Sequence, residues 1–358
     1  MRRILFRSAA LATAALFGCA VFACGFASAQ TLQVTPNPAM ADQPVAIRVS
    51  GLQPGERVTI EATLVDGNDA QWTSEAQFVA DQQGAIDTST QAPASGSYKG
   101  ISGPGLIWSM KPVDKRVMIY RPPKLLGVQP IVFELLRNGR RADSATLEEM
   151  RLAEGVREIR VQGNLHGILF VPAGEGPHPG ATFPEIKAVV AYVPANVRYP
   201  SCCGETHFSY AWTWRGQPLP FVRAFERNDV QTLTDAEIPV EATHGPILMI
   251  GAGEDGVWQS GRMVDEATGR LKRQHFPFEV EVLKYPHAGH RAATPELFPT
   301  WHGPTIHPVS GEKTDFGGSV QGDAESTLDA ISKVLEFLQE NLQADSTTSA
   351  PPAAASTK

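Results

Sequence analysis

The chain has little cysteine. Its 358 residues include four cysteines, and two of them, Cys19 and Cys24, lie within the first 29 residues. The other two, Cys202 and Cys203, are neighbours, and neighbouring cysteines bridge each other only through a strained ring. This excludes a disulfide framework, so we expect buried apolar area to stabilise the fold.

The chain also lacks an excess of basic charge. It carries 31 Lys and Arg against 38 Asp and Glu, a formal net charge of −7 at pH 7. Proteins that bind nucleic acid need a basic face to neutralise phosphates. We therefore expect no nucleic-acid partner.

The first 29 residues have the pattern of a signal peptide. Arg2, Arg3 and Arg7 precede an apolar, small-residue-rich stretch from 9 to 26, and Ala27-Ser28-Ala29 is a typical cleavage site. We expect the mature chain to begin near Gln30 and to be exported, either periplasmic or secreted. Without the leader, 28 basic and 38 acidic side chains remain, a net charge of −10.

Two other interpretations of the leader are less favoured. A transmembrane anchor does not fit the cleavage motif or the polar sequence that follows it. The segments before Cys19 and Cys24 are loosely like lipoprotein boxes, but Phe is a poor residue before the small one. We expect no stable membrane association.

Residues 30–145 have the pattern of an all-β domain. Short alternating or β-branched runs recur about every 10 to 15 residues, with turn sequences between them. This spacing favours an immunoglobulin-like β-sandwich. The strands are expected at Leu32–Thr35, Val45–Val49, Val58–Leu64, Glu75–Val79 and Leu106–Met110.

Residues 150–343 have a different pattern. Lys187–Val193 and Pro246–Ile250 are continuous apolar runs, which is typical of strands buried on both faces of a parallel sheet. A hairpin of Val156–Val161 with Gly167–Val171, a strand at Phe278–Lys284 and a helix at Ser326–Leu342 are also expected. The Ser/Thr/Ala/Pro-rich tail from 344 to 358 predicts disorder.

An acid and a histidine follow two successive strands of this second region. Asp255 lies in the loop after Pro246–Ile250, and His290 lies in the loop after Phe278–Lys284. This order is the layout of an α/β-hydrolase, in which the carboxylate orients the imidazole and the imidazole takes the nucleophile's proton. Asp255 and His290 are therefore the candidate catalytic residues. No metal or cofactor is needed for this chemistry.

Other interpretations of these loops stay open. Glu254 is the alternative acid, since it adjoins Asp255. Either loop alone is also typical of a plain surface turn. A zinc site at His287 and His290 is less favoured, because no third ligand has a suitable spacing.

Several motifs together resemble the acyl-CoA thioester hydrolase / bile acid-CoA:amino acid N-acyltransferase family. The resemblance covers nearly the whole mature chain, and it rests on Gly103–Met110, Gly167–Pro172, Gly176–Gly180, Phe183–Pro194, Trp214–Pro220, Asp255 with Trp258 and Ser260, and Tyr285–His290. It implies a β-sandwich followed by an α/β-hydrolase domain with a Ser or Cys nucleophile, an Asp and a His. Asp255 and His290 fall on the last two. The implied substrate is a small acyl ester or thioester.

The nucleophile of that family has no counterpart here. Its strand-to-helix turn reads G-x-S-x-G or G-x-C-x-G, and neither pattern occurs in this sequence. The departure lies between Gly180 and Thr182, where three strand–helix units of the family, roughly 80 residues, are missing. We therefore expect a truncated α/β-hydrolase domain in which Lys187–Val193 has lost its neighbour. Such an exposed apolar edge favours self-association.

The functional expectation follows from this gap. Ser201, Cys202 and Cys203 are less favoured as substitute nucleophiles, because no strained turn or oxyanion hole accompanies them. We expect ester or thioester hydrolysis to be impaired. An exported protein would seldom meet coenzyme A thioesters, so another acyl compound is expected. One alternative is a catalytically inactive protein that is exported and binds or interacts with other molecules. Another is that the gap is an error in the gene sequence or gene model and that the native protein contains the missing segment.

Overall fold

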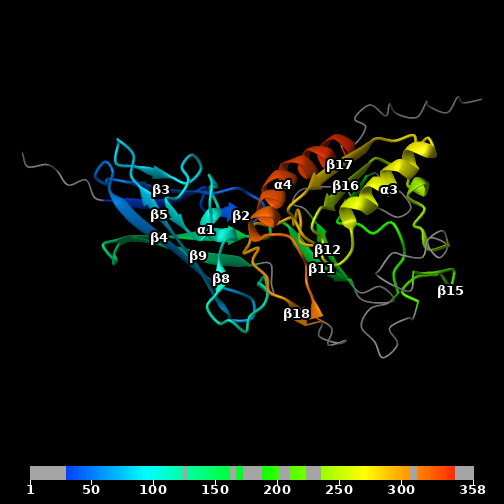
Figure 1. Ribbon diagram of the computed structural model, residues 1–358, viewed down its shortest axis with the longest axis horizontal. Helices are drawn as coiled ribbons and strands as arrows, with labels where there is room; N and C mark the ends of the chain where they lie inside the picture. The colour runs from blue at the N-terminus through cyan, green and yellow to red at the C-terminus, as the bar shows by residue number, and fades with distance from the viewer. Residues whose placement is uncertain are drawn as a thin grey trace, which may run out of the picture.

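The computed structural model describes residues 30–123, 127–161, 167–171, 188–200, 210–222, 235–306 and 313–342. They form two regions, which lie side by side (Figure 1). The first region, Thr31–Met150, consists mainly of β-sheet, and the second region, Arg157–Leu342, contains both strands and helices. The predicted signal peptide, the junction at Gly180–Thr182, the trio Ser201–Cys203 and the tail lie outside these residues, so what was expected of them stays a prediction.

The first region contains two sheets. The smaller has the order β1-β3-β6, with β1 at Thr31–Thr35, β3 at Ala46–Ser50 and β6 at Ile86–Asp87. The larger has the order β2-β10-β9-β4-β5-β7, and β8 also pairs with β5. Its strands are β2 (Ala39–Met40), β4 (Arg57–Val65), β5 (Gln71–Val79), β7 (Ser95–Gly96), β8 (Lys111–Pro112), β9 (Val128–Arg137) and β10 (Arg140–Met150).

One core joins the two sheets. Burial alternates along β4 and β5, as expected when one face of a strand packs inward. Ile47 of the smaller sheet belongs to the same buried cluster as Ile60, Phe78 and Phe133 of the larger one. Burial of this whole cluster is the main apolar contribution to the stability of this region.

One predicted strand of this region is wrong. Leu106–Met110 is not extended, because Gly105–Trp108 forms the short helix α1. A five-residue apolar run does not distinguish a buried strand from a buried helical turn by its period. At Gly105, the first residue of the helix, a Cβ would lie 2.2 Å from the ring of Tyr98, so the chain packs too closely there for any larger residue.

The hairpin β9–β10 was not among the predicted strands. It turns at Asn138 and Gly139, both with positive φ (50° and 72°), as a two-residue hairpin turn requires. β10 runs to Met150, beyond the predicted boundary at 145.

The second region has a three-stranded parallel sheet. Its order is β13-β16-β17, with β13 at Val189–Tyr192, β16 at Ile247–Ala252 and β17 at Val280–Tyr285. These strands match the three predicted runs to within a few residues. The predicted hairpin is also present, as β11 (Arg157–Val161) and β12 (Gly167–Val171). Shorter elements are β14 (Thr213–Trp214), β15 (Gln217–Pro218), η1 (Val240–Ala242), β18 (Thr305–Ile306) and β19 (Lys313–Thr314).

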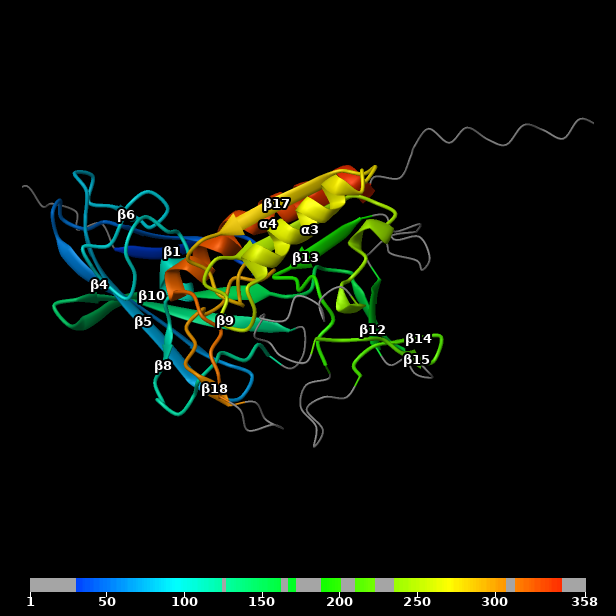
Figure 2. The ribbon, with the colours of Figure 1, turned by 45° about the vertical axis from the view of Figure 1, so that its right-hand side comes forward.

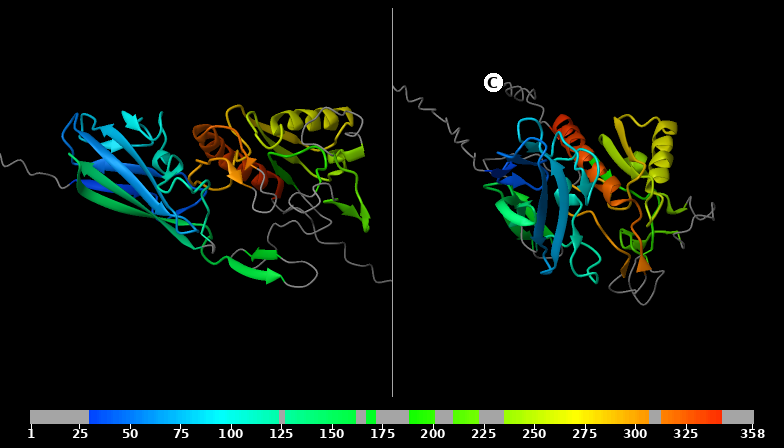
Figure 3. Two further views of the ribbon diagram at one scale, coloured as in Figure 1. Left: turned by 60° about the horizontal axis from the view of Figure 1, so that its bottom comes forward. Right: turned by 60° about the vertical axis from the view of Figure 1, so that its left-hand side comes forward.

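Two helices cover opposite faces of the parallel sheet. Helix α3 (Ser260–Arg273) packs on Ile247 and Met249, whereas α4 (Val320–Leu342) packs on Leu248 and Ile250. Because side chains alternate along a strand, these two sets face opposite sides. The two helices accordingly lie on either side of the sheet (Figure 3, right). Helix α4 contains the predicted helix, and α3 was not predicted. Neither is long and apolar enough to cross a membrane.

Strand β13 lies at the edge of this sheet. All six residues of the central strand β16 are buried, but those of β13 are half-buried and Tyr192 is 37% exposed. Val189 and Val193 donate their N–H groups to β16 and its flank, at Pro246 and Ile250, so the backbone groups of Val190 and Tyr192 point the other way. In the described part of the chain no strand pairs with that outer side.

The two regions meet along the segment 297–302 (Figure 2). Leu297 donates its N–H to the carbonyl of Ala41 at 2.6 Å, and Thr300 donates its N–H to the carbonyl of Trp108 at 3.0 Å. His302 forms an isolated antiparallel bridge with Ile119. The segment that follows His290 is thus fixed by the first region.

Candidate active site

The structure brings Asp255 and His290 together. Asp255 follows the carboxyl end of β16, and His290 follows that of β17. Because the two strands are parallel neighbours, both loops leave the same edge of the sheet. The Nδ1 atom of His290 lies 3.1 Å from both carboxylate oxygens of Asp255.

The carboxylate of Asp255 is held in a closed environment. Its side chain is fully buried, and its Oδ1 atom also accepts the backbone N–H groups of Val257, at 2.9 Å, and Trp258, at 3.1 Å. Hydrogen bonds of this kind stabilise an ionised carboxylate away from water. The loops also approach closely at Gly253, where a Cβ would lie 2.4 Å from the carbonyl oxygen of Pro286.

Two aromatic rings fix the imidazole of His290. The edge of Trp258 meets it at 4.5 Å between ring centroids and 83°, and Phe316 stacks on it at 6.2 Å and 8°. The side chain remains 20% exposed. With Nδ1 directed at Asp255, Nε2 is the nitrogen that can take a proton, and the carboxylate stabilises the imidazolium that forms.

The two alternatives for these loops differ in burial and in partners. Glu254, the alternative acid, pairs with His287 at 3.1 Å, and the two side chains are 50% and 79% exposed. An exposed pair of this kind is screened by water and holds neither group in place. Within the described ranges, no three His, Cys, Asp or Glu side chains gather as a metal site, and His287 and His290 contact different carboxylates.

Among the described residues, no serine or cysteine side chain hydrogen-bonds to His290. Over those ranges, Asp255 is the only side chain that hydrogen-bonds to His290. The nearby Ser260 is fully buried, and its Oγ accepts the N–H of Ala252 at 3.1 Å, which is a structural role. The proposed substitutes Ser201, Cys202 and Cys203 lie outside the description.

A hollow of about 210 Å³ lies between α3 and the segment after β13, lined in part by Asn196, Glu237 and Arg270. Neither Asp255 nor His290 lines it. Arg270 already forms ion pairs with Glu237 and Glu241, so its charge is matched. The buried acid–imidazole pair, and not this hollow, defines the candidate site.

The aromatic walls of the site were not predicted as site residues. Trp258 follows Asp255 by three residues and could be noticed from its place in the loop. Phe316 comes from the segment before α4, and nothing in the sequence joins it to His290. It reaches the imidazole because Phe316 accepts the backbone N–H groups of His290, at 2.7 Å, and Gly256, at 3.1 Å.

Two family models match the chain. Residues 42–163 match the acyl-CoA thioester hydrolase/BAAT N-terminal region, and residues 209–344 match the BAAT/acyl-CoA thioester hydrolase C terminal model. Both halves of the candidate pair lie in the second match.

Curated relatives agree with these models. Human bile acid-CoA:amino acid N-acyltransferase is 38% identical over 160 residues, which cover 42% of this chain and 38% of that protein's own length. Mouse peroxisomal succinyl-coenzyme A thioesterase is 24% identical over 414 positions, covering 88% of this chain and 97% of the relative. Mouse acyl-coenzyme A amino acid N-acyltransferase 1 is 25% identical over 411 positions, covering 87% and 97%.

The long alignments contain many positions without a residue of this chain. In the alignment with the mouse thioesterase, 88% of 358 residues is about 315, so about 100 of the 414 positions are occupied by the relative alone.

Proposed function

Because the chain belongs to the acyl-CoA thioester hydrolase/BAAT family, we propose that it acts on an acyl ester or thioester, with His290 as general base and Asp255 as its orienting acid. The rate is low, because the segment that carries the nucleophile is missing. The buried hydrogen bond between Asp255 and His290 carries the proposal.

The fold supports this assignment in two ways. A parallel sheet with helices on both faces, and an acid and a histidine after successive strands, is the layout of an α/β-hydrolase domain. Two sheets that are antiparallel, apart from the short parallel pair β2–β10, and that pack around one core are the arrangement of a β-sandwich. We therefore propose a β-sandwich followed by a truncated α/β-hydrolase domain.

The proposed gap lies beside β13. About 100 positions of a full-length relative lack a counterpart, which is close to the roughly 80 residues expected of three strand–helix units. Removal of a neighbouring strand also accounts for the half-buried side chains of β13 and the outward backbone groups of Val190 and Tyr192. Neither G-x-S-x-G nor G-x-C-x-G occurs in the chain.

The proposed chemistry uses water in place of a protein nucleophile. The Nε2 atom of His290 takes a proton from a water molecule as it attacks the acyl carbon, and Asp255 stabilises the imidazolium. The tetrahedral intermediate then breaks its bond to the alcohol or thiol, which leaves with the proton returned by Nε2, and the acid product remains. General-base assistance of this kind contributes about 10²–10⁴-fold. A complete triad contributes about 10⁶-fold, so turnover should lie well below that of an intact enzyme.

The substrate class follows from the family and from the predicted leader. The relatives' names concern coenzyme A thioesters. If the chain is exported as its leader predicts, such metabolites are scarce at its location. We therefore propose a different acyl ester or thioester as the natural substrate.

A second candidate is favoured by the edge of β13. This strand is apolar, half-buried and unpaired on its outer side within the described ranges. Such an edge is suited to pairing with another chain. If the protein does not catalyse, we propose that it serves as an exported binding or interaction protein and self-associates through this edge.

The experiment compares hydrolysis of p-nitrophenyl acetate and of acetyl-pantetheine by three forms of the full chain. We expect His290→Ala to lower turnover by about 10²-fold or more. The matched control is His287→Ala, which removes an exposed imidazole from the same loop and should leave turnover unchanged. Equal rates for the wild type and His290→Ala would refute the catalytic proposal, and the second candidate, a binding or interaction protein, would then be favoured.

A further inference from the structure

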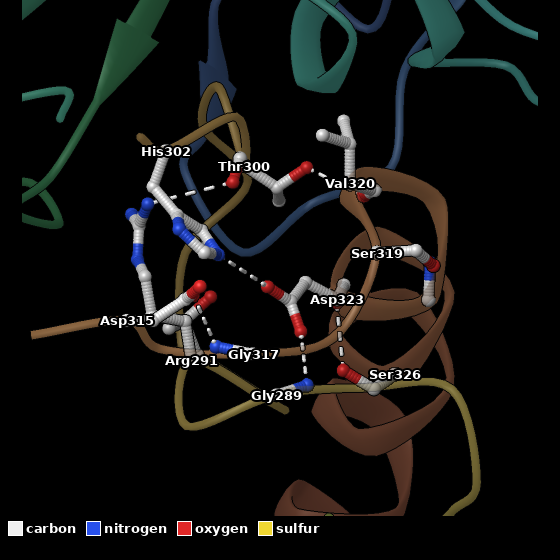
Figure 4. Close-up of polar contacts among 12 residues, drawn as sticks. Gly289, Arg291, Thr300, His302, Asp315, Gly317, Ser319, Val320, Asp323 and Ser326 are labelled. Atoms are coloured by element: carbon white, nitrogen blue, oxygen red, sulfur yellow. Dashed lines mark hydrogen bonds and ion pairs between the residues drawn. The ribbon is translucent and has the colours of Figure 1, made fainter. Parts of the chain in front are cut away.

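A second buried carboxylate lies beside the candidate site. Asp323 is in the first turns of α4, and its side chain is fully buried (Figure 4). The helix begins after Ser319, whose Oγ accepts the N–H of Gly322 at 2.9 Å, as an N-cap residue does. An acid so close to a helix N-terminus is favoured by the helix dipole.

One oxygen of Asp323 holds the loop that carries His290. Its Oδ1 atom accepts the backbone N–H of Gly289 at 2.7 Å, and Gly289 is the residue directly before His290. A Cβ at Gly289 would lie 2.2 Å from the carbonyl oxygen of Gly317, so this peptide is confined on its other side as well. The peptide that directs the imidazole is thus fixed between α4 and the segment before it.

The same helix holds the loop at a second point. Ser326 lies one turn further along α4, and its Oγ accepts the N–H of Ala293 at 2.9 Å and donates to the carbonyl of Asp323 at 2.7 Å. The loop from Gly289 to Ala293 is therefore attached to α4 at both ends. His290 lies between these two attachments.

The other oxygen of Asp323 lacks a hydrogen bond. Oδ2 is buried without a hydrogen-bond partner, and Nε2 of His302 lies 3.8 Å away, too far for a hydrogen bond. Burial raises the pKa of Asp323 to about 6, while the Gly289 N–H and the Arg291 cation oppose that rise. Burial also lowers the pKa of Arg291, to about 10.

A buried carboxylate oxygen without a hydrogen bond lowers the stability of the fold, so Asp323 is an unfavourable residue at this position unless it has another role. The residues around Asp323 indicate that role. His302 is bridged to Ile119 of the first region, and Arg291 follows His290 directly. Asp323 therefore lies where the His290 loop, helix α4 and the contact between the two regions meet.

We propose that Asp323 is a positioning residue for His290: its carboxylate accepts the Gly289 N–H and thereby sets the imidazole against Asp255. It does not contact the reacting atoms. The effect on turnover rests on the proposed function, whereas the effect on the imidazole does not, so the test reads both.

The test uses three variants of the full chain. Asp323→Ala removes the acceptor, Asp323→Asn keeps an oxygen in the place of Oδ1, and Glu325→Gln alters an exposed acid of the same helix as the matched control. The readout is the ¹H–¹⁵N imidazole spectrum, in which the His290 signals are assigned by their loss in His290→Ala. Turnover of p-nitrophenyl acetate and the melting temperature are measured in parallel.

We expect Asp323→Ala to displace the His290 signals and to lower kcat about ten- to a hundredfold with KM unchanged, because a misplaced base loses alignment. Asp323→Asn should retain the wild-type His290 signals, and Glu325→Gln should change nothing. Unchanged His290 signals in Asp323→Ala would overturn the proposal, even if the melting temperature falls. If Asp323→Ala does not fold, displaced His290 signals in a folded Asp323→Asn would overturn it. Wild-type turnover no higher than that of His290→Ala would refute the proposed function alone.

Discussion

Replacement of Glu149 by Gln should stabilise the protein at alkaline pH. Glu149 lies near the end of β10, 4% exposed, and its carboxylate is 3.4 Å from the guanidinium of Arg151. Burial raises the pKa of Glu149 from 4.5 to about 7, with a further rise from Glu296, while Arg151 opposes it. The folded protein thus prefers this carboxyl in its neutral form.

The sign and size of the effect follow from that pKa. A carboxyl whose pKa is raised in the folded state contributes stability that is fully present below about pH 4.5 and is lost as pH rises through about 7. At about 1.4 kcal/mol for each pKa unit, the loss amounts to about 3 kcal/mol. Gln carries no charge at any pH and keeps an oxygen for Arg151, so Glu149→Gln avoids this loss.

Urea unfolding at pH 5 and pH 8 measures the difference. We expect Glu149→Gln to exceed the wild type by about 3 kcal/mol at pH 8 and by less than about 1 kcal/mol at pH 5. The matched control is Glu148→Gln, an exposed acid on the same strand that removes the same charge. A Glu149→Gln protein no more stable at pH 8 than the Glu148→Gln control would refute the reasoning.

Three further predictions concern the site, the sheet and the contact between the two regions. Asp255→Asn should reduce the His290-dependent turnover to near the level of His290→Ala, since the imidazole loses its orienting charge; full turnover in this variant would remove Asp255 from the mechanism. Ile250→Ala on the buried central strand should cost about 2–5 kcal/mol in urea unfolding, and Val190→Ala on the edge strand less than about 1.5 kcal/mol. Equal losses would argue that β13 is not an edge. Thr300→Val removes the Oγ1 hydroxyl, which donates to the carbonyl of Val320 at 2.7 Å and to that of Trp108, in the first region, at 3.3 Å, and should lower the free energy of unfolding by about 1 kcal/mol; no loss would show that this hydroxyl does not stabilise the contact.

Two strands of the parallel sheet, β13 and β16, were predictable because they are continuous apolar runs. Strand β16 is buried on both faces, and its sequence shows no alternation to confuse it with a surface strand. Helix α3 was missed although Met263, Val264, Ala267 and Leu271 are buried at helical spacing. Gly261 and Gly269 weaken that pattern, since glycine disfavours a helix interior.

The hairpin β9–β10 was missed for a different reason. The Asn138-Gly139 turn is a strong local signal, but β10 carries charged residues at five of its eleven positions and lacks the apolar alternation that marks a strand. Its partner β9 supplies the buried side chains Ile131, Phe133 and Leu135. Tertiary pairing, and not its own sequence pattern, makes β10 a strand.

The acid and the histidine of the site could be located in advance because each follows a predicted strand. Parallel neighbours put their carboxyl ends at one edge, so sequence order alone predicts that the two meet. Phe316 and Asp323 could not be located in this way. They reach the site only through the packing of α4 and the segment before it, which sequence spacing does not report.

A covalent test bears most directly on the central claim, that the acid–base pair is present without a group to form an acyl-enzyme. The full chain is incubated with p-nitrophenyl acetate, the reaction is quenched in acid, and the mass of the intact protein is measured by mass spectrometry. Peptide mapping then examines Ser201, Cys202 and Cys203 for an acetyl group. We predict an unmodified mass at every time point while His290-dependent hydrolysis proceeds. An acetyl adduct that forms in the wild type, is absent in His290→Ala and turns over at the hydrolysis rate would contradict the account.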